Sequence, residues 1–257
     1  MHERRYDRGP SAGPDAGPGT VPVFAGILCG IAAISYSSWV LEVFLDPGID
    51  VRDGYVSELS ATDQPYSVVF RAGDLVTGAL AIVVASTALV RLRRRPPAVT
   101  GWVALLLFGL GAIGDSVFAM DCAPNMDTGC ALRERVAQVS FSHQFHALTS
   151  GVVVVAGIAA VLALSLAARR YGWWPALARW GWMLAAADAA CAVATLALML
   201  AGEPLGLAQR LQISFFCLAL LVIAWALLAE REPREGGERR ERVAVGAHPG
   251  NARDVSR

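Results

Sequence analysis

A small set of ionisable side chains stands between long apolar stretches of this chain. Asp115 and Asp121 come near the end of one apolar stretch, and His143 and His146 begin the next. Ionisable groups at membrane depth cost about 2.5–3.5 kcal/mol or more unless they are paired or hydrated, so they usually mark a functional site. We therefore expect a polar site where the ends of these two stretches meet.

The two histidines have a spacing that could hold one divalent metal ion such as zinc. Residues three apart share one face of a helix, so His143 and His146 would present both imidazoles to the same side. A catalytic zinc site needs a third protein ligand and an open position for water, and Asp121 or Asp115 could supply that ligand. Two alternatives stay open, namely a hydrogen-bonded network that is structural or senses protons, and direct acid–base chemistry.

Asp115 is also a candidate catalytic carboxylate. It follows Gly109, Gly111 and Gly114, and glycine lets another helix approach closely. Such an approach would shield the carboxylate from lipid, and Asp115 could then simply hold two helices together. Asp74 is expected to form an intrahelical ion pair with Arg71, and Asp188 lies in an apolar stretch away from the other acidic groups.

A polar loop before residue 67 adds further candidates. Ser57 and Glu58 could lie beside a reacting water, whereas the alternative for Ser57 is to cap a short helical turn. Glu42 and Arg210 are candidate ligand-binding residues, because a guanidinium can dock a phosphate or carboxylate headgroup. The alternative is that these two residues pair with each other or extend to the headgroup region.

Cys122 and Cys130 bracket a short loop and differ from the three other cysteines, which lie within apolar stretches. We predict a Cys122–Cys130 disulfide, with free thiols or metal ligands as the alternatives. The bridge would mainly stiffen the loop beside Asp121.

Composition identifies the class of protein to which these residues belong. The chain is 55% hydrophobic and 17% charged, with a mean hydropathy of +0.47, and a stretch of about 20 apolar residues can cross a bilayer as a helix. The sequence predicts an all-α fold, a six-helix transmembrane bundle over residues 23–229. The six predicted spans are Val23–Leu45, Ser67–Val90, Val99–Met120, Ser142–Ala168, Ala176–Ala201 and Ala208–Ala229.

The distribution of arginine predicts the orientation of this bundle. Arginines gather after the second, fourth and sixth spans, at Arg91, Arg93, Arg94, Arg95, Arg169, Arg170, Arg179, Arg231, Arg234, Arg239 and Arg240. By the positive-inside rule both termini are cytoplasmic in a multi-pass protein of the plasma membrane. Residues 1–22 and 230–257 are polar and are predicted to be disordered cytoplasmic tails. The 22 basic and 22 acidic residues balance, and we expect no nucleic-acid partner.

A family resemblance rests on three parts of the chain. These are the polar segment that runs from Tyr55 to Tyr66 and contains Ser57-Glu58-Leu59, the aspartate of Phe118-Ala119-Met120-Asp121, and His146 at the head of the fourth span. Over about residues 23–229 the chain resembles the prokaryotic membrane family known as domain of unknown function 998. The resemblance implies a bacterial six-helix bundle with a polar site on its outer side, and it implies no activity. A more distant similarity of arrangement is to the alkaline ceramidases and adiponectin-type receptors, which have seven spans and a three-histidine zinc site, whereas this chain has two histidines outside its tails.

Three functions are compatible with these residues. The favoured hypothesis is a non-enzymatic membrane protein that binds a lipid or a membrane protein partner at its outer face. The second is a metal-dependent hydrolase or transferase acting on a lipid, in which Asp121, His143 and His146 hold a metal that activates water near Ser57 and Glu58. The third is a proton-coupled carrier.

Overall fold

Residues 18–229 are described by a computed structural model, and within them the chain forms helices and loops and no strand. Six helical segments are long and apolar enough to cross a membrane, which fits an integral membrane protein. They agree with the predicted spans to within a few residues at each end. Residues 1–17 and 230–257 of the two predicted tails lie outside the described residues. The six segments are Val23–Leu45, Ser67–Arg91, Pro96–Val117, Phe141–Tyr171, Leu177–Ala201 and Gly206–Ala229.

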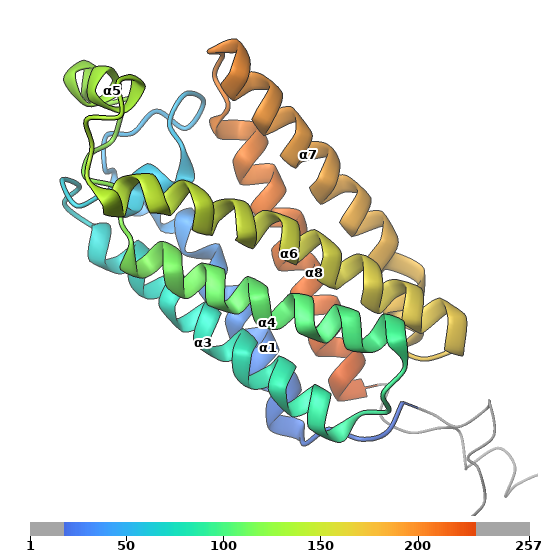
Figure 1. Ribbon diagram of the computed structural model, residues 1–257. Helices are drawn as coiled ribbons and strands as arrows, with labels where there is room; N and C mark the ends of the chain where they lie inside the picture. Colours follow the sequence, from blue (N-terminus) through green and yellow to red (C-terminus); the bar gives the residue numbers. More distant parts are fainter. Residues whose placement is uncertain (1–17, 230–257) are drawn as a thin grey trace, which may run out of the picture.

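The spans pack in two layers (Figure 1). Helices α3 (Ser67–Arg91), α4 (Pro96–Val117) and α6 (Phe141–Tyr171) lie side by side in one layer. The second layer contains α1 (Val23–Tyr36), α8 (Gly206–Ala229) and α7 (Trp182–Ala201). Because α1 packs on both α3 and α8, the first span of the chain lies between the second and the last.

Glycines determine how closely the helices of the first layer approach one another. A Cβ built on Gly109 of α4 would lie 2.7 Å from the carbonyl oxygen of Gly78 on α3, and one on Gly78 would lie 2.5 Å from Gly109 O. On another face of α4, a Cβ on Gly114 would lie 2.5 Å from Thr149 Cγ2 of α6. The expectation that these glycines admit neighbouring helices is confirmed, because only hydrogen fits at these contacts.

Two spans contain turns that the apolar pattern did not predict. In the first span, α1 gives way to the 3₁₀ turn η1 (Ser37–Leu41) and the single helical turn α2 (Glu42–Leu45). In the fifth span, a π turn, η3 (Leu177–Gly181), precedes α7. Such departures from α geometry redirect the side chains that follow them.

The loops at one end of the bundle carry two more short helices. These are the 3₁₀ turn η2 (Val56–Ser60) and α5 (Thr128–Arg135), which begins after Asp127, whose carboxylate accepts from the Gly129 N–H at 2.8 Å. We call this end, formed by residues 46–66, 118–140 and 202–205, the polar end. The opposite end holds the starts of α1 and α4 and the end of α8 (Figure 1).

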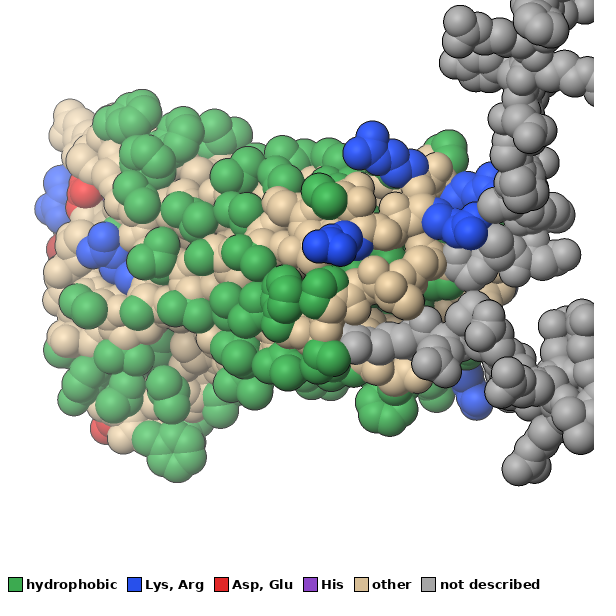
Figure 2. Space-filling model, turned by 90° about the horizontal axis from the view of Figure 1, so that it is seen from below, with side chains coloured by type: hydrophobic (Ala, Val, Ile, Leu, Met, Phe, Trp, Pro, Cys, Tyr) green, Lys and Arg blue, Asp and Glu red, His purple; other side chains and the backbone are tan. Residues whose placement is uncertain are grey.

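The surface of the bundle matches a membrane-spanning arrangement. On the face that Figure 2 shows, apolar side chains cover the middle, Asp and Glu lie at the polar end beside a few arginines, and further arginines gather toward the opposite end. Near the termini, residues 18–22 pack against the loop after α3, where the Arg93 N–H donates to Pro18 O at 2.8 Å.

Candidate functional site

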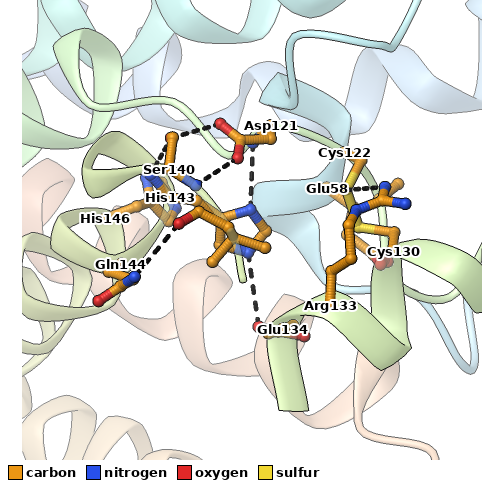
Figure 3. Close-up of polar contacts among 12 residues, drawn as sticks. Glu58, Asp121, Cys122, Cys130, Arg133, Glu134, Ser140, His143, Gln144 and His146 are labelled. Carbon is orange, nitrogen blue, oxygen red and sulfur yellow. Dashed lines mark hydrogen bonds and ion pairs between the residues drawn. A yellow bond between two sulfur atoms is a disulfide. The ribbon is translucent and has the colours of Figure 1, made fainter. Parts of the chain in front are cut away.

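Asp121 and the start of α6 form a closed set of hydrogen bonds at the polar end (Figure 3). Ser140 is the N-cap of α6, and its Oγ accepts from the His143 N–H at 3.2 Å. The Asp121 carboxylate in turn accepts from Ser140 N at 2.7 Å and from Ser140 Oγ at 2.5 Å. Burial acts to raise the pKa of Asp121, but the two hydrogen bonds from Ser140 outweigh it and hold that pKa below its ordinary value.

The ring of His143 is held by the same loop. Its Nδ1 lies 3.1 Å from the Asp121 backbone nitrogen and accepts that N–H. In the neutral ring the proton is therefore on Nε2, which lies 3.6 Å from Glu134 Oε1 of α5. His143 thus joins the loop after α4 to α6 and faces α5.

His146 faces a different set of groups, deeper in the bundle. Its Nδ1 lies 2.9 Å from Phe118 O and 3.7 Å from Asp115 Oδ1. A carbonyl oxygen can only accept, so Nδ1 carries a proton and the neutral ring has its lone pair on Nε2. That Nε2 is buried and has no hydrogen-bond partner within residues 18–229. The turn of Phe118 toward His146 also explains why α4 ends at Val117, before the predicted Met120.

Asp115 joins α4 to α6. Its carboxylate accepts from Thr149 Oγ1 and from Ser150 Oγ, the latter at 3.1 Å to each carboxylate oxygen. These contacts are the ones that the helix-joining alternative expects, and the catalytic role of Asp115 stays a prediction. The predicted Arg71–Asp74 ion pair is wrong, since Arg71 Nε donates instead to Ser116 O at 2.8 Å.

A polar cavity of about 80 Å³ lies beneath the loops of the polar end. Its wall comes from α1, η1, η2, α3, α4, α6 and α8. The polar side chains that line it include Ser57, Asp74, Asp115, His146, Ser150 and Gln212. The volume has room for several water molecules or for one small polar group.

Asp188 lies closer to this cavity than its sequence position suggested. It is buried and lines a second cavity of about 20 Å³. Tyr36 and Gln212 border both cavities. The second cavity therefore places Asp188 below the first one, rather than apart from it.

Glu58 is committed to holding two loops together. Its fully buried carboxylate accepts from Tyr55 N at 2.8 Å and from Asn125 N at 2.7 Å, and Asn125 Nδ2 adds contacts of 3.1 and 3.2 Å. Burial raises the pKa of Glu58, and the hydrogen bonds from Asn125 only partly offset this. Ser57 lines the cavity but does not cap a turn, because η2 begins at Val56 and its N-cap is Tyr55.

Glu42 and Arg210 pair with each other, as one of the two alternatives predicted. Arg210 Nε and Nη2 donate to the two carboxylate oxygens of Glu42 at 2.7 and 2.6 Å, and both side chains are buried. Arg210 Nη1 donates to the carbonyl oxygens of Val51, Gly54 and Gly206. A ligand at Arg210 would have to displace one of these bonds, so the ligand-binding role of the pair stays a prediction.

Cys122 and Cys130 lie at disulfide distance, with their Cα atoms 6.1 Å apart, which confirms the predicted pairing (Figure 3). Among the described residues, no group of three or more His, Cys, Asp or Glu side chains is placed to hold a metal ion. Asp121, His143 and His146 instead hold separate hydrogen-bond partners. Their shared metal site stays a prediction.

Several residues of the site were not singled out from the sequence. Ser140 precedes the apolar run of α6 at an N-cap position, which is a recognisable signal. Gln209 and Gln212 are polar residues three apart at the start of an apolar span, and Gln209 Oε1 accepts from Val56 N at 2.8 Å. The role of Asn125 could not be recognised in the sequence, because it depends on two loops that are distant in the chain and meet only in the folded protein.

Six apolar spans, five of which contribute to the wall of the cavity, define a multi-pass membrane protein of the helical-bundle class. The family model described as "Protein of unknown function (DUF998)" matches residues 29–226, so the chain belongs to this family. No curated protein and no solved structure is significantly similar to it.

Proposed function

We propose that this protein binds a membrane lipid by its headgroup in the cavity at the polar end, without catalysing a reaction. The observation that carries the proposal is His146, a buried side chain that lines the cavity and whose Nε2 has no hydrogen-bond partner in the part of the chain that the structure describes. Buried polar atoms are nearly always hydrogen-bonded, so an unpaired one beside a cavity indicates a missing partner.

Gln212 supports the same assignment. It is buried on α8 and lines the cavity, and its amide makes no hydrogen bond within the described part of the chain. Hydrogen bonds fix the neighbouring loops. Glu58 joins the loop of residues 46–66 to the loop that precedes α5, and Arg210 joins the same loop to α8. A rigid wall with unused polar atoms is what a preformed binding site requires.

The position of the cavity favours a lipid over a water-soluble ligand. Val153 and Val154 of α6 and Ile213 of α8 line it, and α6 and α8 make few direct contacts with each other. A molecule in the bilayer could therefore reach the cavity between these two helices. The arginine distribution favours an orientation with the polar end on the outer side of the plasma membrane and both termini in the cytoplasm.

The metal-dependent alternative asks more of the same residues. Glu58 and Asp121 would each have to give up backbone hydrogen bonds, and His143 and His146 would have to turn toward each other from opposite partners. Lipid binding requires none of these changes. The proton-coupled carrier is supported, among the described residues, only by the presence of buried acidic side chains.

The test is to measure lipid that co-purifies with the full chain in mild detergent, by native mass spectrometry. We expect about one retained lipid per chain in the wild type and several-fold less in Gln212→Met, which removes the amide at nearly constant volume. Gln144→Met is the matched control, because Gln144 is exposed on α6 and donates only to Val139 O.

Equal retention by all three proteins would overturn the proposal. Elemental analysis of the same samples tests the metal alternative. About one metal per chain that disappears in the His143→Ala/His146→Ala variant would make the hydrolase or transferase the better assignment.

A further inference from the structure

The cavity is acidic, and no lysine or arginine in its described wall balances the charge of the acids. Asp74 and Asp115 both line it, and none of the described residues that line it is Lys or Arg. Asp74 makes no hydrogen bond or ion pair within residues 18–229, and among these residues the only basic side chain within ion-pair distance of Asp115 is His146, at 3.7 Å. A carboxylate removed from water is costly unless a positive group or hydrogen-bond donors compensate it.

The remaining polar atoms extend this set of acceptors. Because His146 Nδ1–H points to Phe118 O, its unpaired Nε2 offers a lone pair to whatever fills the cavity. A ligand that suits two carboxylates and an imidazole lone pair must donate several hydrogen bonds and carry positive charge. An ammonium group does both.

Aromatic rings and one donor complete the lining. Tyr36, Trp39 and Phe70 border the cavity, and the faces of such rings attract cations. Trp39 Nε1 is buried and has no hydrogen-bond partner among residues 18–229, so its N–H can donate to an oxygen atom next to the ammonium group. The volume of about 80 Å³ suits a primary ammonium better than a trimethylated one.

We propose that the ligand recognised in this cavity is a primary ammonium group on a lipid headgroup, held between Asp74 and Asp115 and by Nε2 of His146. The inference rests on the lipid binding proposed above and assigns the chemical class of the headgroup. Removing either acid should remove the preference for the amine.

The experiment offers the purified full chain three lipids with identical acyl chains, namely phosphatidylethanolamine, phosphatidylcholine and phosphatidylglycerol, and measures retention by native mass spectrometry. We expect phosphatidylethanolamine to be retained about tenfold or more over the other two, since hydrogen bonds to charged groups are worth this much. Asp74→Asn and Asp115→Asn should abolish the preference, whereas Glu203→Gln, which changes an exposed acid at the polar end, should keep it.

Adding ethanolamine alone to delipidated protein tests whether the ligand is a free amine or the amine of a lipid headgroup. Its binding, seen as a rise in melting temperature that Asp74→Asn removes, identifies a free amine as a sufficient ligand. Retention of the amine lipid without such a rise identifies the headgroup as the source. Both outcomes support the ammonium assignment.

Equal retention of the three lipids by the wild type would overturn the ammonium assignment and leave lipid binding intact. Retention of none of them would overturn both proposals. The wild-type comparison needs no variant, so it decides the question even where an aspartate variant does not fold.

Discussion

At the scale of single residues, the polar groups of this protein divide into those that are fully satisfied and those that are not. Arg210, Glu58 and Asp121 use their charged atoms on partners within the chain. Beside the cavity, and within residues 18–229, His146 leaves its Nε2 without a partner and Asp74 makes no hydrogen bond. The first group holds the loops in place, and the second is available to a ligand.

The Glu42–Arg210 pair should be strongly coupled. Glu42→Leu leaves the Arg210 cation buried and unpaired, which we expect to cost about 3–5 kcal/mol of unfolding free energy. In Glu42→Leu/Arg210→Leu no charge is left unpaired, so the double variant should lose less than the sum of the two single variants. Unfolding in mixed detergent micelles measures all four proteins, and strictly additive losses would contradict the coupling.

Asp121 should give the protein an acid-sensitive stability. Its pKa is lower in the folded than in the unfolded state, so the stability it contributes is present above the unfolded pKa of about 3.9 and is lost as pH falls through the folded pKa. We expect Asp121→Asn to cost about 1 kcal/mol at neutral pH.

The difference in stability between Asp121→Asn and the wild type should become smaller as the pH falls below about 4. Melting temperatures measured from neutral to acid pH test this. Asp53→Asn is the control, because Asp53 is exposed and makes no hydrogen bond within the described residues. If the difference in melting temperature between Asp121→Asn and the wild type stayed constant with pH, this would contradict the role assigned to Asp121.

The sequence was informative about which polar residues matter and less so about what they contact. Asp115, Asp121 and His146 were recognised because polar groups stand out against apolar spans. The partners of these residues were not predictable, since Phe118 O and the Asp121 N–H are backbone atoms whose positions depend on how α4 ends. Asp74 was assigned to Arg71 because proximity in sequence was the only available criterion.

At the scale of helices, close packing decides the geometry of the first layer. The crossing of α3 and α4 at Gly78 and Gly109 leaves no room for a methyl group. The helix lengths followed from hydropathy, because about 20 apolar residues are needed to cross a bilayer. The turns η1 and η3 did not, since they change backbone geometry without changing the apolar character of the span.

Gly109→Ala should destabilise the bundle. The added Cβ would lie 2.7 Å from Gly78 O and 2.8 Å from Ile82 Cγ1, so α3 and α4 must separate, at a cost of about 1–3 kcal/mol. The control is Gly151→Ala on α6, where a Cβ would meet no atom within 4 Å and alanine is the better helix former. Thermal unfolding in detergent compares the two, and equal stability of both variants would argue against the close crossing.

At the scale of the whole molecule, the cavity lies beneath the loops of the polar end, and on the face that Figure 2 shows most of the arginines lie toward the opposite end. This asymmetry makes the orientation in the membrane a functional property. If the polar end faced the cytoplasm, the cavity would sample the lipids of the other leaflet.

Cysteine labelling in intact cells should establish the orientation. With a membrane-impermeant maleimide we expect Asp53→Cys and Glu203→Cys to react and Arg94→Cys to react only after the cells are permeabilised, because arginine-rich loops stay inside. All three positions are exposed. The wild-type chain is the control, since Cys122 and Cys130 are paired, Cys29 and Cys217 are buried, and the half-buried Cys191 lies within the fifth span. The reverse labelling pattern would place the cavity on the inner side.

The first and the last span of the chain contact each other, so the bundle can be fully assembled only after the last span is synthesised. Near the termini, Gly26 packs so closely on α8 that a Cβ there would lie 2.5 Å from Leu228 Cγ, and near the polar end Glu42 meets Arg210. During synthesis on the ribosome, α1 enters the membrane first and α8 last. Glu42 must therefore remain unpaired in the nascent chain until the sixth span is inserted, and the cavity lacks its α8 wall for all but the final step of translation.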